Sequence, residues 1–171
     1  MKLENAIKLA LEYESGVYDV YREAMNKTTD ESAKRIFKVL CEEEMGHLKY
    51  LQSRLSEWQK LGKINVEKLG TSIPTREAIN KGLQDLRKTV KPRPTKQILE
   101  LELLKKALDA ETKASNFYKE MVAALDGEGQ ELFKRFVEIE EGHEAIVQAE
   151  INSVSNLGFW FDTPEFRLEA E

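Results

Sequence analysis

The chain contains two histidines, and each lies three positions after a glutamate. The pairs are Glu44 with His47 and Glu140 with His143, and a glycine directly precedes each histidine. Residues three apart lie on one face of a helix, so each pair presents a carboxylate and an imidazole together. Oxygen and nitrogen donors of this kind suit a first-row transition metal. The doubled motif therefore predicts a metal site.

The composition is that of a globular protein, and it narrows the classes of partner. Of the 171 residues, 41% are hydrophobic and 33% are charged, and the net charge is -5. This excess of acid argues against nucleic acid as the main partner. No apolar run approaches the roughly 18 residues that span a bilayer, so no membrane partner is expected. We expect a single domain over residues 1–171.

The compartment is predicted from the cysteine content and from the beginning of the chain. Cys41 is the one cysteine in the sequence, so no internal disulfide can form. The first residues lack the uninterrupted apolar stretch of a secretory signal. A cytoplasmic location is the expectation.

Apolar residues recur at spacings of three and four in four long stretches. Such a stripe is typical of the buried face of an amphipathic helix. The predicted helices cover residues 3–25, 30–61, 96–125 and 128–155. A glutamate interrupts each stripe near its middle, at Glu14, Glu44, Glu111 and Glu140.

Turn residues indicate how these helices are connected. Asp30 offers an N-cap for the second helix, and Thr95 offers one for the third. The short turn at 126–127 forces the last two helices to run antiparallel. The connection over 62–95 is long enough to cross the bundle lengthwise, and a short helix is expected over 75–87. The third long helix should therefore run parallel to the second.

The two halves of the chain repeat each other. Glu14 and Tyr21 stand 97 residues before Glu111 and Tyr118, and the Glu44–His47 motif stands 96 residues before its second copy. The repeat predicts an all-α four-helix bundle made of two duplicated antiparallel helix pairs. A long crossover would join the pairs, and a short C-terminal tail would follow.

Four glutamates inside an apolar seam need compensation. Each ionised carboxylate costs several kcal/mol unless it is paired or coordinated, and no lysine or arginine occupies a nearby stripe position. Two divalent ions would balance the four charges. With His47 and His143, six protein ligands would serve two metals and leave positions open for water, oxygen or peroxide. The donors suit iron or manganese and do not choose between them.

Several neighbours of the motif have two interpretations each. Tyr21 and Tyr118 are core aromatics, or they hydrogen-bond the ligand carboxylates and orient them. Gly46 and Gly142 indicate a close approach of helices, or they are neutral remnants of the duplication. Cys41 is a small buried side chain, or it has a redox role.

At these residues the chain resembles the ferritin-like di-iron carboxylate superfamily, and within it the rubrerythrin branch, over residues 3–155. The resemblance implies two irons bridged by two glutamates. By that resemblance, Glu14 and His47 would bind one iron, Glu111 and His143 would bind the other, and Glu44 and Glu140 would bridge them.

Two departures from rubrerythrins bear on activity. The four-cysteine rubredoxin-like domain of full rubrerythrins cannot be formed with Cys41 alone, so electrons would come from a separate donor protein. Rubrerythrins usually carry a further glutamate one turn after the ligand of the third helix. In this chain Ala114 stands at that position, and Val17 stands at the equivalent position in the first half of the repeat. The ligand set is thus the plainer six-residue kind, similar to that of bacterioferritin or manganese catalase.

These observations leave a ranked set of functions. The first is an oxidoreductase that reduces hydrogen peroxide, as a rubrerythrin-like peroxidase in oxidative stress would, or that reacts with dioxygen. The second is a ferroxidase or iron-storage protein, and a manganese catalase-like enzyme competes within the enzyme class. A helical interaction protein with a vestigial metal comes last.

Two further segments suggest partners. The segment 76–96 carries seven lysines or arginines against two acids; it is an ordinary solvated crossover or a docking surface for an acidic electron carrier. The tail over 157–171 begins with an apolar run at 157–161. It is expected to pack across a bundle end or against a second subunit, with Trp58 in the same cluster, and similar proteins are commonly homodimers.

Overall fold

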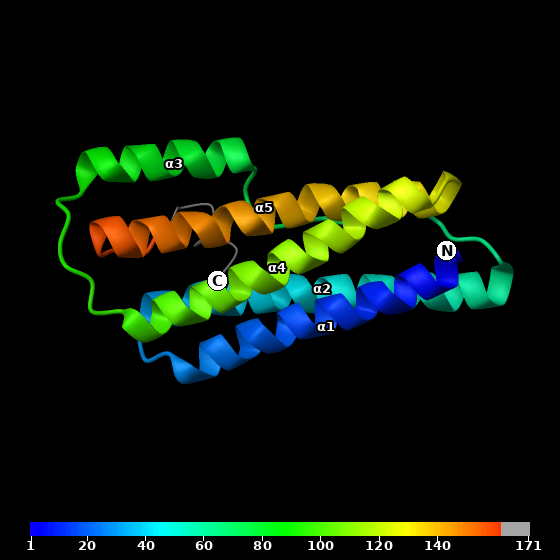
Figure 1. Cartoon of the computed structure of the whole chain (residues 1–171), viewed down its shortest axis with the longest axis horizontal. Coiled ribbons are helices and arrows are strands. Elements are labelled where there is room, and N and C mark those ends of the chain that lie inside the picture. Colours follow the sequence, from blue (N-terminus) through cyan, green and yellow to red (C-terminus); the bar gives the residue numbers. More distant parts are fainter. Residues whose placement is uncertain (162–171) are drawn as a thin grey trace.

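The computed structural model describes residues 1–161, and the secondary structure in them consists of helices. Their bounds are α1 Leu3–Lys27, α2 Glu31–Leu61, α3 Arg76–Thr89, α4 Ile98–Ala124 and α5 Gly127–Leu157. The four long helices run side by side, and α3 lies outside them along α5 (Figure 1). The predicted all-α bundle is confirmed at this level, and the origin by duplication stays a prediction.

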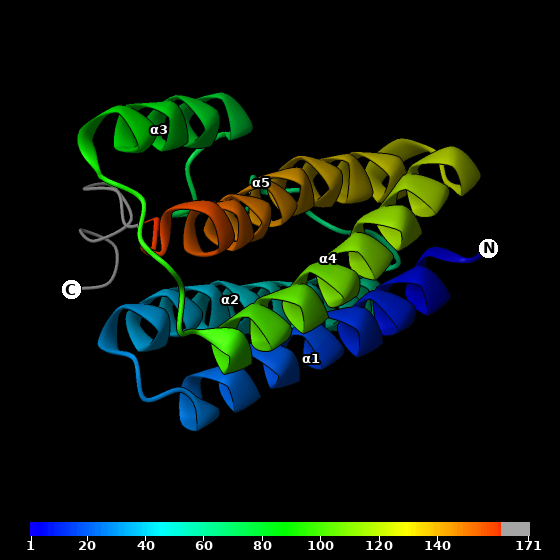
Figure 2. The ribbon, with the colours of Figure 1, turned by 60° about the vertical axis from the view of Figure 1, so that its left-hand side comes forward.

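The order and direction of the helices follow from the lengths of their connections. α1 packs against α2 and α4, and α4 packs against α5. α2 and α4 run in the same direction, opposite to α1 and α5 (Figures 1 and 2). The crossover between α2 and α4 thus spans the bundle lengthwise, and it contains α3 close to the position predicted for its short helix.

Most of the helix ends are set by local hydrogen bonds. The side chain of Asp30 accepts from the backbone N of Ala33 at 2.9 Å, so α2 has the predicted N-cap. The predicted cap at Thr95 is wrong, because α4 begins at Ile98. The Thr95 hydroxyl instead accepts from the backbone N of Gln97 at 3.1 Å, forming a local turn ahead of the helix.

The predicted stripes form the core. They are buried along all four long helices, and the interrupting glutamates are buried with them. Aromatic rings fill the space beside the glutamates: Tyr118 lies 4.8 Å from Phe136 and 5.7 Å from Phe133, measured between ring centroids. Among residues 1–161, no helix combines the length and apolar character that crossing a membrane requires.

The first residues of the C-terminal tail pack across one end of the bundle, which is one of the two arrangements that the sequence left open. Trp160 meets Phe37 edge to face, with the centroids 5.9 Å apart, and the backbone N of Phe161 donates to Glu150 at 2.7 Å. Trp58 does not belong to this cluster. It lines a pocket together with Leu3 near the C-terminal end of α2, and that end of α2 lies at the other end of the bundle from the C-terminal end of α5 (Figure 1). The rest of the predicted tail, residues 162–171, lies outside the described residues.

Candidate metal centre

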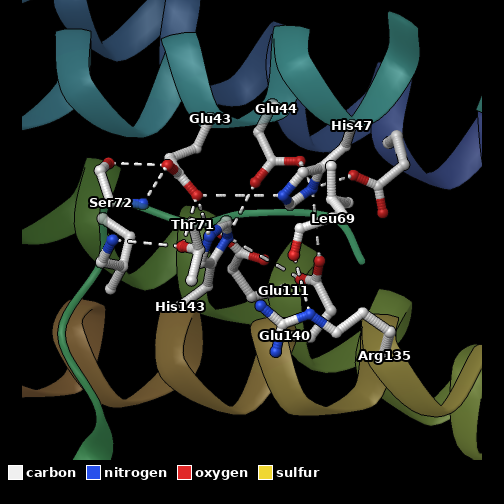
Figure 3. Close-up of polar contacts among 12 residues, drawn as sticks. Glu43, Glu44, His47, Leu69, Thr71, Ser72, Glu111, Arg135, Glu140 and His143 are labelled. Atoms are coloured by element: carbon white, nitrogen blue, oxygen red, sulfur yellow. Dashed lines mark hydrogen bonds and ion pairs between the residues drawn. The ribbon is translucent and has the colours of Figure 1, made fainter. Parts of the chain in front are cut away.

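Six side chains from the four long helices meet in the interior of the bundle. They are Glu14 from α1, Glu44 and His47 from α2, Glu111 from α4, and Glu140 and His143 from α5. His47 is 1% exposed and the other five are fully buried. Figure 3 shows the two histidine rings lying between the glutamates. All six residues that the sequence singled out as metal ligands are therefore brought together.

The six residues fall into two overlapping groups that could each hold an ion. Each group is compact, with its potential ligand atoms all within 4.8 Å of one another. One group is Glu14, Glu44, His47 and Glu140, and the other is Glu44, Glu111, Glu140 and His143. Glu44 and Glu140 belong to both groups. Two carboxylates shared between two groups is the arrangement expected for bridging ligands.

Each histidine directs its Nδ1 atom towards the glutamates. His47 Nδ1 lies 2.8 Å from Glu14 Oε2 and 3.3 Å from Glu44 Oε2. His143 Nδ1 lies 2.9 Å from Glu44 Oε1 and 3.5 Å from Glu111 Oε1. The two rings are stacked, with centroids 5.2 Å apart and planes 14° apart. Both imidazoles therefore direct their Nδ1 atoms into the same interior space.

The electrostatics of the cluster are dominated by burial and by like charges. Burial raises the pKa of Glu140 well above its ordinary value, and Glu14 and Glu111 raise it further. Burial also raises the pKa of Glu44, to about 7, although His47 opposes the shift. Burial would lower the pKa of His47, but Glu44 and Glu14 raise it to about 10. Without a metal, these carboxylates and imidazoles can stay buried together only if some of them bind extra protons.

Unsatisfied ligand atoms test whether metal ions fit here. Both carboxylate oxygens of Glu140, Oε2 of Glu44 and Oε2 of Glu111 are buried without a hydrogen-bond partner among the described residues. His143 Nδ1 and Glu44 Oε1 lie 2.9 Å apart but do not form a well-aligned hydrogen bond. Orphaned buried polar atoms are rare in folded proteins unless a ligand satisfies them. Within residues 1–161, no lysine or arginine forms an ion pair with these glutamates. Four carboxylates and two imidazoles fit two divalent cations.

The two tyrosines hydrogen-bond the glutamates across the bundle. The hydroxyl of Tyr21 donates to Glu111 Oε1, and that of Tyr118 donates to Glu14 Oε1. Each tyrosine therefore orients the glutamate of the other half rather than the one on its own helix. Both rings are fully buried, so they are also core aromatics.

Sequence reasoning missed one carboxylate beside the cluster. Glu43 Oε2 lies 3.3 Å from His143 Nε2 and 4.0 Å from His47 Nε2. The spacing could have found it, because Glu43 precedes His47 by four residues and so shares its helix face. Its partners Thr71 and Ser72 come from the crossover, where no periodic pattern points to them.

The glycines beside the histidines do not mark a close helix approach. A Cβ atom added at Gly46 would meet nothing within 4 Å, and one at Gly142 would only touch Pro74 and Ile73 of the crossover, at 3.7 and 4.0 Å. Of the two interpretations, the close helix approach is therefore contradicted, and the neutral remnant of a duplication stays a prediction. Cys41 is buried as expected, and burial raises the pKa of its thiol.

A comparison with protein-family models matches residues 1–55 to rubrerythrin. The chain is rubrerythrin-like over this segment. The match covers α1 and most of α2, and with them Glu14, Glu44 and His47. Over residues 1–55 it confirms the resemblance inferred from the sequence, and it is consistent with a ferritin-like di-iron carboxylate protein. No curated protein and no solved structure matches the chain.

Proposed function

We propose that this rubrerythrin-like protein binds two iron ions and reduces hydrogen peroxide with electrons from a separate donor protein. The observation that carries the proposal is the pair of buried ligand groups that share Glu44 and Glu140. Glu14 and His47 would hold one ion, Glu111 and His143 the other, and the two shared glutamates would bridge them. The family match over residues 1–55 supports iron.

The roles of the protein groups follow from their positions. A bound ferrous pair would supply the two electrons that the reduction of one peroxide requires. Tyr21 and Tyr118 hold Glu111 and Glu14 by hydrogen bonds, which fixes the direction of each carboxylate. The apolar walls, Phe136 and Phe133 among them, keep bulk water away from the cluster.

A second reaction is favoured by a specific observation. Ala114 and Val17, which stand where rubrerythrins usually have a further glutamate and at its counterpart, are buried and apolar. The site is then limited to six protein ligands, as in bacterioferritin and manganese catalase. Oxidation of ferrous iron by dioxygen, or manganese-dependent catalase activity, are therefore the alternatives.

Metal analysis and rapid kinetics test these proposals in sequence. The protein is loaded anaerobically with ferrous or manganous ions, and the ions bound per chain are counted. About two ferrous ions that oxidise faster with peroxide than with dioxygen support the peroxidase. Faster oxidation by dioxygen supports a ferroxidase, and catalase turnover confined to the manganese form supports the third candidate. Fewer than one tightly bound ion of either metal would overturn the metal site itself.

The assembly and location of the protein are proposals as well. We expect a homodimer in the cytoplasm, supplied with electrons by an acidic carrier protein. Sedimentation separates this from storage, because storage requires a hollow shell of many subunits. A large shell would favour iron storage over the peroxidase.

A further inference from the structure

Glu43 occupies the side of the two imidazoles that faces away from the buried glutamates. Its Oε2 atom lies 3.3 Å from His143 Nε2 and 4.0 Å from His47 Nε2. The Nδ1 atoms of both rings point the other way, to the metal-binding glutamates (Figure 3). One carboxylate therefore faces the outer nitrogens of both histidines.

Glu43 is itself held in place by the crossover. Its Oε1 atom accepts from the backbone N of Ser72 at 2.7 Å and from the Ser72 hydroxyl at 2.6 Å. Its Oε2 atom accepts from the Thr71 hydroxyl at 2.7 Å, and that hydroxyl accepts from the backbone N of Ile73 at 3.1 Å. Three donors thus hold the carboxylate in place independently of its contacts with the imidazole rings.

The second half of the chain offers no equivalent group. In the 96-residue repeat, Ile139 takes the position of Glu43, and its side chain is 2% exposed. Within residues 1–161, Glu43 is the one carboxylate within 4.0 Å of either Nε2 atom. Glu43, from the first half of the chain, is therefore within hydrogen-bond distance of His143 from the second half, whereas His47 Nε2 lies too far away for a hydrogen bond.

We propose that Glu43 is a positioning residue for His143. By accepting from the Nε2–H group of His143, it holds this ring in the tautomer whose Nδ1 is free to bind a metal. It also links the His143 ring to Thr71 and Ser72, so that the crossover contributes to the geometry of the metal site. The inference rests on the metal-binding function proposed above.

Glu43, His47 and His143 also form a group that could bind a cation. Their contacts argue against a cation site of this kind. Glu43, His47 and His143 would supply only three ligands. Both oxygens of Glu43 already accept hydrogen bonds from the crossover. A carboxylate satisfied in this way is better suited to accept from an N–H group than to neutralise an ion.

Cobalt binding tests the proposal without recourse to activity. Metal-free wild-type protein and the variants Glu43→Ala, Glu43→Gln and Glu42→Ala are titrated with Co²⁺ against a competing chelator, and the visible spectrum is recorded. Glu43→Ala should weaken the binding of the ion that His143 would hold by about 10- to 100-fold, with a smaller effect on the other ion, and alter the spectrum. Glu43→Gln keeps one acceptor oxygen and should recover part of the affinity. Glu42→Ala is the matched control, because Glu42 is exposed and pairs only distantly, with Lys38 at 3.9 Å.

Three results would overturn the inference. Unchanged affinity and spectrum in Glu43→Ala would show that the residue is dispensable. Loss of one ion from a total of three, with the other two unaffected, would show that Glu43 binds a cation. Failure of the wild type to bind Co²⁺ would overturn the metal site and this inference together, whereas the first two results leave the metal site standing.

A second variant covers the case in which Glu43→Ala does not fold. Ser72→Ala removes one donor to Glu43 and leaves the carboxylate in place. The melting temperature of its metal-free form reports the fold, and its Co²⁺ affinity should fall several-fold. A folded Ser72→Ala protein with wild-type affinity and spectrum would contradict the proposal.

Discussion

At the scale of single residues, the shared glutamates oppose the stability of the metal-free protein. Burial and the neighbouring Glu14 and Glu111 disfavour the charged form of Glu140. An unfolded chain at neutral pH ionises the same side chain without penalty. Such a side chain does not contribute to the stability of the metal-free fold, and the proposed metal binding would give it a role.

Replacing Glu140 with glutamine should therefore have opposite effects with and without metal. The metal-free Glu140→Gln protein should melt at least about 3 °C above the metal-free wild type at pH 8, because the amide needs no compensating charge. The same variant should lose most of the stabilisation that iron gives, since one bridging ligand is missing. Calorimetry with and without ferrous ions measures both. A metal-free variant less stable than the wild type would contradict the electrostatic account.

The pH dependence of the metal-free protein follows from the same cluster. The pKa of Glu44 is raised to about 7 and that of His47 to about 10, so the folded state binds more protons than the unfolded state above about pH 4.5. The stability that these protons provide is lost as the pH rises from about 4.5 to 7 for Glu44, and from about 6.5 to 10 for His47.

The metal-free melting temperature should consequently fall by at least about 5 °C between pH 5 and pH 9. Glu14 acts in the opposite sense at the acid end. Burial would raise its pKa, but His47 lowers it to about 2, so its contribution is lost as the pH falls from about 4.5 through 2. The stabilisation by metal should grow with pH, because protons compete for the ligands. Melting curves across this range check both trends, and a metal effect that is largest at pH 5 would contradict them.

At the scale of helices, replacing two glycines with alanine should change the stability of the protein in opposite directions. Gly46 is exposed in the middle of α2, and a Cβ atom there would meet nothing within 4 Å. Gly158 ends α5 with a φ of 72°, and a Cβ atom there would clash with the backbone oxygen of Arg93. Gly46→Ala should stabilise the protein by about 1 kcal/mol, and Gly158→Ala should destabilise it by about 2 kcal/mol or more. Urea denaturation measures both, and equal effects of one sign would contradict the assignment.

The helices and most of the metal site could be predicted because both depend on short-range periodicity. A glutamate within an apolar stripe and a histidine three residues later specify one face of one helix, and four such faces share one core. The start of α4 was missed because the Thr95 hydroxyl bonds a backbone N ahead of the helix. Glu43 shares a helix face with His47, but its hydrogen-bond partners Thr71, Ser72 and His143 are remote in sequence. Trp58 was misplaced because its neighbours are also remote in sequence, and periodicity carries no information about such contacts.

At the scale of the whole molecule, positive charge is concentrated away from the acidic interior. The basic segment consists of Arg76, Lys81, Arg87, Lys88, Lys91, Arg93 and Lys96, all of which are exposed. It includes α3 and the chain that follows, and α3 packs along α5 (Figure 2). The same crossover reaches the histidines through Thr71, Ser72 and Glu43. A donor protein docked on the basic segment would therefore lie on the part of the chain that is joined to the metal centre.

Electron delivery by an acidic carrier should then depend on ionic strength and on this segment. Peroxide turnover driven by a reduced, negatively charged rubredoxin-type protein should slow about tenfold between low salt and 0.5 M salt, because screening weakens steering. Lys81→Glu combined with Lys88→Glu should slow turnover at low salt by a similar factor. The control, Lys49→Glu with Lys60→Glu, changes the net charge equally on α2, outside the basic segment, and should have little effect. If the two double variants were equally slow, net charge rather than docking at this segment would govern the rate. If salt had no effect on turnover, the donor would not be steered by charge at all.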